Sequence, residues 1–399
     1  MERSRSTFLL IAVLLFFGCA IVQPELQPIS SSGEALPGLE AFDRAMLDLL
    51  EENHLPGGTL AVAYQGRLVL AKGYGFARKG LTGSEPMQPK IRLRIASLSK
   101  PITSAAVMLL VERGQLKLDD TVLEVLGDAA PAAKDLRDPR VARITVRQLL
   151  EHRGGWDRTE SQEPMFERFP LCPSRAKRFL ETTVLDFVPG ERSAYSSVGY
   201  CILGRVIEKA SGKPYGDFVK DAIAEPLGIK SFALGTEQGS LADEGQYFAT
   251  QSPGGRTLSP YGGFSMGARG ASGGWITTAA DYLRFLNALD GTRKPALLKP
   301  ETYAELTARP DAADSSGKPT YYAKGLNVRP LRVGANIWHR GSFAGTMSFA
   351  AKLAAGWSYV AIFNQRPENF EAILSRIARM LSEDSRKATP PAEGDLFAK

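Results

Sequence analysis

The amino-acid sequence predicts a mixed α/β protein of the α+β type, in which helices flank one antiparallel sheet and a mainly helical lobe is inserted. Two observations predict this class. Alternating strand patterns gather near both ends of the 399-residue chain, whereas the middle carries helical spacing. Strands that come first and last along the chain can complete one sheet if the helical middle folds as a separate lobe.

The first predicted elements are a helix and a hairpin. Residues 39–53 repeat Leu, Phe and Met at helical spacing, so we expect a helix that ends before Pro56. Residues 58–77 then alternate as two strands around Gln65 and Gly66, a spacing typical of a tight hairpin.

The other end of the chain repeats the strand pattern. We expect strands at 337–342, 346–353 and 358–364, with Gly356 in the turn between the last two. Residues 368–381 gather their apolar side chains on one face, which predicts an amphipathic closing helix.

The middle of the chain carries start and stop signals for helices. Thr145 is expected to cap a helix that stops at Gly154, and a second periodic segment stops at Gly212. Thr278, with an aspartate three residues later, forms a capping box for a third helix.

Two other features of the middle have structural interpretations. The glycine-rich segment 267–274 lacks the ending of a phosphate-binding loop, so we expect a turn that leads into the helix capped by Thr278. His152 falls in the last turn of its helix, where a cationic side chain interacts favourably with the helix dipole.

The composition excludes several classes of function. The chain is 44% hydrophobic and 23% charged, with a scattered net charge of +6 and no basic run among aromatics, so no nucleic-acid partner is expected. Three histidines and three cysteines, unclustered, make neither a metal site nor a disulfide framework, and no cofactor is implied. Cys172 and Cys201 either pair after export or remain buried thiols.

The N-terminus predicts export. Arg3 and Arg5 precede the apolar run 8–17 and then Gly18-Cys19-Ala20, so residues 1–20 resemble a signal peptide and are too short to span a bilayer. Cleavage after Ala20 would give a secreted or periplasmic protein. The alternative is a lipoprotein signal, in which lipidated Cys19 attaches the protein to the membrane of the cell envelope.

The pattern Ser-x-x-Lys occurs three times, and its surroundings separate the copies. Ser174 follows Cys-Pro and suits the start of a surface helix, while Ser315 lies in a polar loop. Ser97 instead follows an apolar strand-like segment and opens a helix that is apolar on nearly every face and therefore buried.

This setting suits nucleophilic chemistry at Ser97. If the helix starts at or just before Ser97, Lys100 lies one turn further on the same face, and Pro101 falls in the first turn, where proline is tolerated. Apolar surroundings would lower the pKa of Lys100, so its neutral amine could take the serine proton. The alternatives are a capping serine beside a snorkelling lysine, or an extended Lys100 before the proline.

These residues resemble a known superfamily. Ser-x-x-Lys between a strand and a long apolar helix is similar to serine β-lactamases and penicillin-binding proteins, most of all the branch with class C β-lactamases, D-alanyl-D-alanine carboxypeptidases and related esterases. Further ordered matches, such as "ITVRQLLEHRGG" and "FVPGERSAYSSVGYCILGRVIEKASG", extend the resemblance over about Leu39 to Leu381. The resemblance implies a β-lactamase/transpeptidase-like fold, with a serine hydrolase domain at 39–382. The composition, rich in Pro, Ser and Glu before this domain, predicts a linker at 21–38, and we expect a disordered tail at 383–399.

The resemblance extends to a second motif, Tyr-x-Asn, which reads Tyr195-Ser196-Ser197 here. It implies that Tyr195 shares a proton with Lys100 and serves as base and then acid. Ser197 replaces the asparagine that binds a substrate amide, and its hydroxyl is shorter. This departure weakens the β-lactamase and peptidase interpretations more than the esterase one.

The third motif, Lys-Thr-Gly, appears as His339-Arg340-Gly341. The resemblance implies that His339 lines the pocket, that Gly341 lets an acyl group approach the strand, and that the backbone N–H groups of Ser342 and Ser97 form an oxyanion hole. The alternative for His339 is a polar residue at a strand edge.

The predicted function is that of an exported serine hydrolase. It would cleave a small ester, amide or peptide through a Ser97 acyl-enzyme, with carboxylesterase-like activity favoured. One alternative is a β-lactamase or D-alanyl-D-alanine carboxypeptidase that acts on cell-wall peptides. The other is a non-catalytic binding or scaffold protein that keeps the fold.

Overall fold

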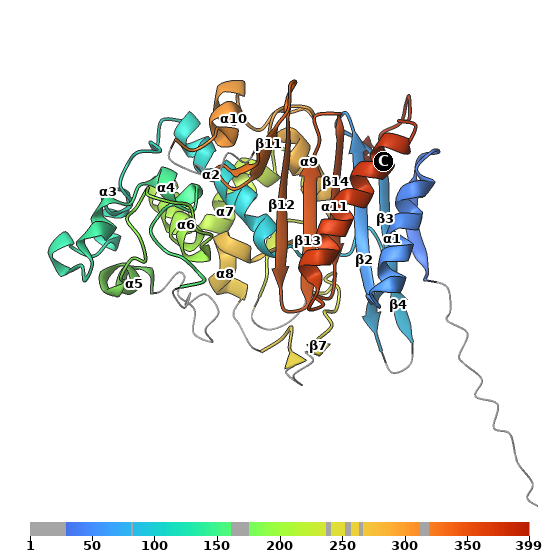
Figure 1. Ribbon diagram of the computed structural model, residues 1–399, viewed down its shortest axis with the longest axis horizontal. Coiled ribbons are helices and arrows are strands. Elements are labelled where there is room, and N and C mark those ends of the chain that lie inside the picture. The colour runs from blue at the N-terminus through green and yellow to red at the C-terminus, as the bar shows by residue number, and fades with distance from the viewer. Residues whose placement is uncertain are drawn as a thin grey trace, which may run out of the picture.

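A large antiparallel sheet dominates the computed structural model, which describes residues 29–80, 83–160, 175–236, 241–251, 257–262, 266–311 and 319–398 (Figure 1). The N-terminal part contributes β1 (Ser31–Ala35), β2 (Gly57–Tyr64), β3 (Arg67–Lys79) and β4 (Ser84–Pro86). The C-terminal part contributes β10 (Tyr321–Tyr322), β11 (Asn327–Pro330), β12 (Ala335–Phe343), β13 (Thr346–Lys352) and β14 (Trp357–Phe363). The strand order is β1-β3-β2-β14-β13-β12-β11-β10, with β4 beside β3. Pairing of β2 with β14 joins the two chain ends in one sheet, as predicted.

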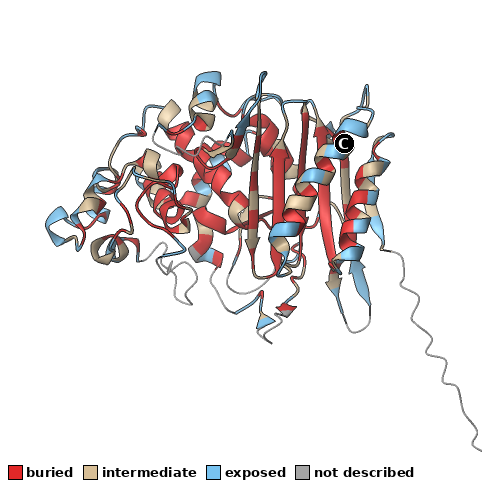
Figure 2. Ribbon diagram, viewed as in Figure 1, coloured by how far each residue is buried: buried red, intermediate tan, exposed pale blue. Residues whose placement is uncertain are grey.

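The two faces of the sheet are covered by different parts of the chain. Helices α1 (Glu40–Glu52) and α11 (Phe370–Lys387) pack side by side on one face, where Phe42 and Ile373 join a core with strand residues such as Val62. Helix α9 (Ala279–Ala288) packs on the other face, against β2 and β14. Figure 2 shows the resulting buried layer through the sheet, with exposed residues on the outer side of α11.

The inserted lobe is mainly helical, and helix α2 (Ser99–Glu112) lies at its centre. Residues 99–110 of α2 are all buried, which explains why the sequence is apolar on nearly every face. The other helices of the lobe are α3 (Val122–Leu126), α4 (Val146–Leu150), α5 (Ala176–Thr182), α6 (Ser197–Ser211), α7 (Tyr215–Val219), α8 (Met266–Gly273) and α10 (Pro300–Thr307). Short strands β5 (Leu93–Arg94), β9 (Trp275–Thr277) and β6 (Ala233–Leu234) form a second sheet, and β7 (Thr250–Gln251) pairs with β8 (Thr257–Leu258).

The local signals in the sequence are largely confirmed. Gln65 and Gly66 both have positive φ, at 50° and 78°, so the β2–β3 hairpin turns where expected. Thr145 caps α4 by accepting a hydrogen bond from the Gln148 N–H, although α4 ends at Leu150, before the expected Gly154. Helix α6 ends at Gly212, whose φ of 69° is the left-handed conformation that glycine favours.

The segment predicted as a linker at 21–38 is partly structured. Residues 31–35 form β1, which pairs antiparallel with β3 in register from Ser31 opposite Tyr74. The sequence pattern did not predict this edge strand, because its side chains are polar. Backbone hydrogen bonds, rather than contacts of apolar side chains, hold it in the sheet. The predicted signal peptide at 1–20, with Cys19, lies outside the described residues.

The prediction that residues 383–399 form a disordered tail is wrong over the described part. Helix α11 continues to Lys387, and Asp395 beyond it accepts a hydrogen bond from the Leu68 N–H at 2.9 Å. The same carboxylate lies 2.9 Å from Arg293 in an ion pair, and the Phe397 ring contacts that guanidinium at 4.2 Å. A few specific contacts therefore fix a segment whose composition is typical of disorder.

Two further observations concern membrane-spanning helices and the cysteines. None of the helices in the described ranges is long and apolar enough to cross a membrane. Cys201 is disulfide-bonded, and the other two cysteines, Cys19 and Cys172, lie among the residues that the structure does not describe.

Candidate active site

Ser97 lies in a tight turn between β5 and α2, in the 3₁₀ segment Ala96–Leu98. The turn is held from strand β13, because Ser348 Oγ donates a hydrogen bond to the Ile95 carbonyl at 2.8 Å. Ala96 just before the serine has φ +48°, a strained conformation for a residue other than glycine. The 3₁₀ segment therefore begins one residue before Ser97, whereas the α-helix itself begins at Ser99, two residues later than the expected start at or just before Ser97.

Lys100 is fully buried and directed at Ser97. Its side chain is 0% exposed, and Nζ lies 3.2 Å from Ser97 Oγ and 2.9 Å from the Ser272 carbonyl oxygen. The ammonium position is also 4.8 Å from the centroid of the Tyr195 ring. The snorkelling and extended alternatives for Lys100 are therefore wrong. The competing copies at Ser174 and Ser315 lie outside the described residues.

The segment 267–274 was predicted as a turn, and this is wrong. It forms helix α8, kinked at Gly270, and it presents the Ser272 carbonyl to Lys100. Glycine-rich composition normally favours turns, but here it allows close packing. A Cβ on Gly274 would lie only 2.6 Å from the Gly270 backbone nitrogen and 2.8 Å from the Met266 carbonyl oxygen.

His339 on β12 is buried and neutral. Its Nδ1–H donates to the Arg340 carbonyl at 2.7 Å, and its Nε2 accepts a hydrogen bond from the Tyr322 hydroxyl at 3.1 Å. Burial, with a smaller contribution from the charge of Lys100, lowers the pKa of His339 to about 3. The ring is therefore a fixed polar wall rather than a cation.

This neutral histidine predicts a pH dependence of stability. An unfolded histidine has a pKa of about 6.5, so between about pH 6.5 and about pH 3 the unfolded chain binds a proton that folded His339 does not. We expect the free energy of unfolding to fall with decreasing pH in this window, by about 1.4 kcal/mol per unit for this one group. Urea unfolding at pH 7 and pH 5 should show a shallower decline in His339→Gln, and equal declines would contradict this assignment.

His152 contacts the candidate residues directly, which sequence reasoning missed. Its ring lies 4.2 Å from the ring of Tyr195 and 4.6 Å from that of Tyr322, between centroids, and its Nδ1 accepts from the Ser196 N–H at 3.3 Å. Burial lowers its pKa well below the ordinary value, and the charge of Lys100 adds to this. The predicted role as a cationic partner of the helix dipole is therefore wrong.

Gly341 allows β12 to pass close to the nucleophile turn. A Cβ at this position would lie 2.3 Å from the Ile95 carbonyl oxygen, 2.4 Å from Ser348 Oγ and 3.1 Å from the Ser97 backbone nitrogen. We expect Gly341→Ala to destabilise the fold by about 1–3 kcal/mol through overpacking. Activity should also fall, because the turn must move away from β12. Thermal unfolding together with steady-state kinetics checks both effects, and wild-type values for the two would contradict this packing.

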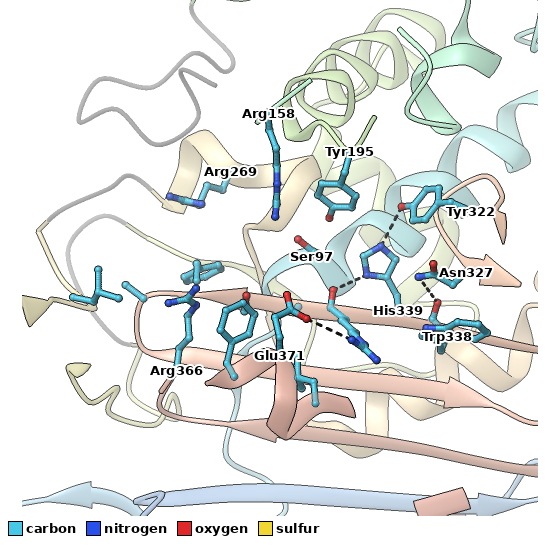
Figure 3. Close-up of a pocket in the computed structure, with 18 of the residues that line it drawn as sticks. Ser97, Arg158, Tyr195, Arg269, Tyr322, Asn327, Trp338, His339, Arg366 and Glu371 are labelled. Carbon is cyan, nitrogen blue, oxygen red and sulfur yellow. Dashed lines mark hydrogen bonds and ion pairs between the residues drawn. The ribbon is translucent and has the colours of Figure 1, made fainter. Parts of the chain in front are cut away.

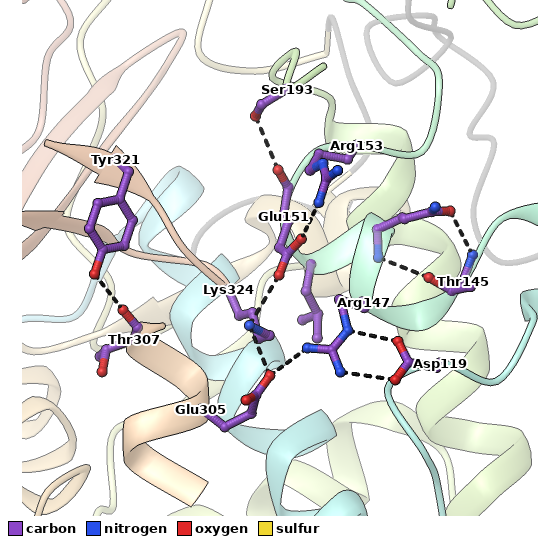
Figure 4. A network of polar contacts seen from close by, with 12 residues as sticks. Asp119, Thr145, Arg147, Glu151, Arg153, Ser193, Glu305, Thr307, Tyr321 and Lys324 are labelled. Carbon is purple, nitrogen blue, oxygen red and sulfur yellow. Dashed lines mark hydrogen bonds and ion pairs between the residues drawn. The ribbon is translucent and has the colours of Figure 1, made fainter. Parts of the chain in front are cut away.

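A buried network of charges supports the loop that carries Tyr195 (Figure 4). Glu151 and Lys324 are each 1% exposed and lie 3.0 Å apart, and Glu151 also pairs with Arg153 at 3.1 Å. Two hydrogen bonds reach the loop from the same turn: Ser193 Oγ donates to the Glu151 carbonyl, and the Ala194 N–H donates to the His152 carbonyl. The network therefore fixes the approach to Tyr195.

Removing the charge of Glu151 should be costly. Glu151→Gln leaves two buried cations, Lys324 and Arg153, with less compensation, so we expect a loss of about 3 kcal/mol in unfolding free energy. Asp119→Asn is a matched control, because Asp119 belongs to the same network through Arg147 but its side chain is 73% exposed. That control should cost no more than about 1 kcal/mol. If urea titrations show similar losses of unfolding free energy for Glu151→Gln and Asp119→Asn, burial does not determine the cost of removing the charge.

Most of the predicted site residues meet at one cavity of about 880 Å³ (Figure 3). The predicted residues among its lining are Ser97, Tyr195, His339, Gly341 and Ser342. Lys100 lies beneath Ser97, and Figure 3 shows the hydroxyl end of Tyr195 pointing toward Ser97. Ser197 begins α6 and is not among the described residues that line the cavity. Within the same ranges, no group of three or more His, Cys, Asp or Glu side chains is arranged to hold a metal ion.

The sequence motifs also left several lining residues unidentified. Tyr322 and Asn327 come from β10 and β11, while arginines come from a loop, from α8 and from the segment after β14. No spacing relates these residues to Ser97, because their proximity arises only from the folding of distant segments.

The chain is similar to several known proteins. The family model described as Beta-lactamase matches residues 42–382. The chain is 35% identical over 205 residues to the probable fimbrial assembly protein FimD, serogroup H1, of Dichelobacter nodosus, a match that covers 51% of this chain. The match spans 49% of FimD, about half of that curated relative.

Two longer similarities cover most of the fold. Esterase EstB of Burkholderia gladioli is 29% identical over 321 residues, which cover 72% of this chain and 78% of that protein. The crystal structure of D-amino acid amidase from Ochrobactrum anthropi SV3, complexed with L-phenylalanine amide, is 25% identical with a TM-score of 0.69. It covers 87% of this chain and 99% of the amidase chain. With a family model that spans most of its length and a fold shared with these proteins, the chain belongs to the Beta-lactamase family.

Proposed function

We propose that the protein is a serine hydrolase that acts through an acyl-enzyme on Ser97. The observation that carries this proposal is the buried Nζ of Lys100, 3.2 Å from a serine hydroxyl that opens onto the cavity. A serine needs an adjacent base to become nucleophilic, and a lysine amine in apolar surroundings can serve as that base.

The proposed reaction has two balanced steps. Ser97 Oγ attacks the carbonyl carbon of the ester or amide, and its proton passes to the pair formed by Lys100 and Tyr195. The pair returns the proton to the leaving oxygen or nitrogen, which departs and leaves an ester on Ser97. A water molecule then gives its proton to the same pair and attacks the carbonyl carbon of this ester. The bond to Ser97 Oγ breaks, the pair returns the proton to Ser97 Oγ, and the acid is released.

The backbone near Gly341 supports an oxyanion hole and a substrate groove. We assign the oxyanion hole to the N–H groups of Ser97 and Ser342, which both line the cavity. Strand β11 pairs with β12 only over 335–338, and no other described strand pairs with this edge of β12 over 339–343. An extended acyl chain could therefore lie along that open edge.

Carboxylesterase-like activity is favoured within this class. Ser197 stands where a substrate amide would meet an asparagine, and a short hydroxyl at the start of α6 offers less to an amide. The similarity to an esterase over 72% of the chain supports the same choice. β-Lactamase or D-alanyl-D-alanine carboxypeptidase activity on cell-wall peptides remains the second candidate, which the similarity to penicillin-binding proteins supports.

The substrate class can be tested by direct comparison. We expect kcat/KM for 4-nitrophenyl butyrate to exceed that for a chromogenic cephalosporin and for release of D-alanine from an acyl-D-alanyl-D-alanine peptide. Equal or faster turnover of either of the latter would overturn the preference for esters while keeping the serine mechanism. Hydrolysis of none of the three would count against the hydrolase itself.

Export is a separate part of the proposal, supported by the N-terminal sequence. The mature mass measured from the native host should correspond to a chain that begins after Ala20, with the protein released from the cell or in the periplasm. A mature chain that begins at a lipidated Cys19 would instead show that the protein is anchored to the cell envelope. The uncleaved chain in the cytoplasm would contradict both.

A further inference from the structure

We propose that the cavity selects substrates that carry a carboxylate or similar anionic group away from the bond that is cleaved. The binding wall consists of Arg158, Arg269 and Arg366, which we call the arginine wall. The inference rests on the proposed function of Ser97 and specifies its substrate class.

The charge of the cavity lining is the first observation. Its described charged residues are the three arginines of the wall, Arg340 and one carboxylate, Glu371. Glu371 lies 3.4 Å from Arg340 in an ion pair, so it is already engaged. Across the described ranges, neither Arg158 nor Arg366 forms an ion pair. The described part of the lining therefore carries an excess of positive charge that an anionic substrate would balance.

The second observation is how aromatic rings hold these guanidinium groups at the cavity. Arg158 lies 4.9 Å from the centroid of the Tyr195 ring, Arg269 lies 5.2 Å from that of Phe343, and Arg366 lies 3.9 Å from that of Phe370. Such stacking fixes the plane of a guanidinium, and the N–H groups of Arg158 and Arg366 remain able to donate. Preorganised planar forks of this kind match carboxylates well.

The position of the arginine wall suits an anionic group of the substrate that lies away from the reacting carbonyl. In Figure 3 the three arginines lie on one side of Ser97, and His339 and Tyr322 lie on the other. Arg158 runs beside Tyr195 toward Ser97, whereas Arg269 and Arg366 lie further away. A carbonyl at Ser97 would thus place one end of an extended substrate against the wall.

The surroundings of Arg366 favour an anion as well. Burial lowers the pKa of Arg366, Glu371 and then Glu368 act in the opposite direction, and repulsion from Arg158 is a smaller contribution in the same direction as burial. A bound carboxylate would offset both costs. A substrate with a free ammonium group at this end would add to the repulsion and should bind poorly.

The test compares esters that differ only in charge. One pair is 4-nitrophenyl hydrogen adipate and 4-nitrophenyl methyl adipate, which probes the acyl side. A second pair is 4-acetoxybenzoate and its methyl ester, which probes the leaving-group side. We expect wild-type kcat/KM to favour the anionic member of at least one pair by roughly tenfold or more at low salt.

Variants of the arginine wall test whether these residues cause the preference for anionic esters. Arg158→Gln and Arg366→Gln should each reduce the ratio of anionic to neutral kcat/KM toward one. Arg332→Gln is the matched control, because Arg332 is exposed, does not line the cavity and loses the same charge. Ratios near one in the wild type for both pairs, or a preference that the wall variants keep, would overturn the inference.

The experiments distinguish a failure of the proposed anion selectivity from a failure of the proposed hydrolase activity. Turnover of the neutral esters without an anionic preference removes the inference and leaves the proposed function intact. If no ester is hydrolysed, calorimetric binding of adipate and of the neutral adipamide tests the wall alone. Tighter binding of adipate that Arg158→Gln weakens supports it, and equal binding overturns it.

Discussion

Replacing Ser97 by alanine is expected to lower kcat/KM for a short acyl ester by at least about 10⁴-fold, because it removes the hydroxyl that forms the acyl-enzyme. Ser97 Oγ accepts a hydrogen bond from the buried Lys100 amine, and its removal leaves that amine without a reacting partner. Rates should be measured by steady-state kinetics on protein whose unfolding midpoint matches the wild type.

The other two copies of the motif provide matched controls. Ser174→Ala and Ser315→Ala change the same residue in the same tetrapeptide spacing and should keep wild-type rates. Unchanged hydrolysis in Ser97→Ala, or a comparable loss in either control, would contradict the assignment. The absence of any hydrolysis in the wild type would instead favour a binding or scaffold protein that keeps the fold.

Replacing Lys100 by methionine is expected to cause the second large loss of activity. Methionine fills a similar volume, so the fold should persist, but it cannot accept the proton of Ser97. We expect kcat/KM to fall by about 10²–10⁴-fold, the usual contribution of a positioned general base. The 0% exposure of Lys100 makes rescue by solvent difficult.

Lys177 offers the control for this substitution. It completes the Ser174 copy of the motif at the same spacing, but it is exposed and hydrogen-bonds the Asp128 carbonyl. Lys177→Met should leave the steady-state rate unchanged. A Lys100→Met variant with wild-type turnover would show that another group takes the proton.

The sequence predicted the parts of the site that depend on local geometry. Ser97 and Lys100 are three residues apart on one helix, so their contact follows from helical periodicity and a buried setting. The hairpin at Gln65 and the caps at Thr145 and Gly212 were predictable for the same reason, since each depends on a few neighbouring residues.

The parts that it did not predict depend on contacts between distant segments. Tyr322 reaches His339 from another strand, and Arg158 and Arg366 are more than 200 positions apart, so no local pattern reports either relation. Segment 267–274 was misjudged for a related reason. Its glycines favour a turn in isolation, but packing against α2 and α6 makes a helix more favourable.

Mass-spectrometric mapping after reaction with a fluorophosphonate probe tests the central claim most directly. The account predicts one covalent adduct, on the peptide that contains Ser97, which is lost in Ser97→Ala and formed far more slowly in Lys100→Met. Prior saturation with a hydrolysable ester should slow labelling of the same peptide. An adduct on a different serine, or no adduct on the folded wild-type protein, would contradict the account.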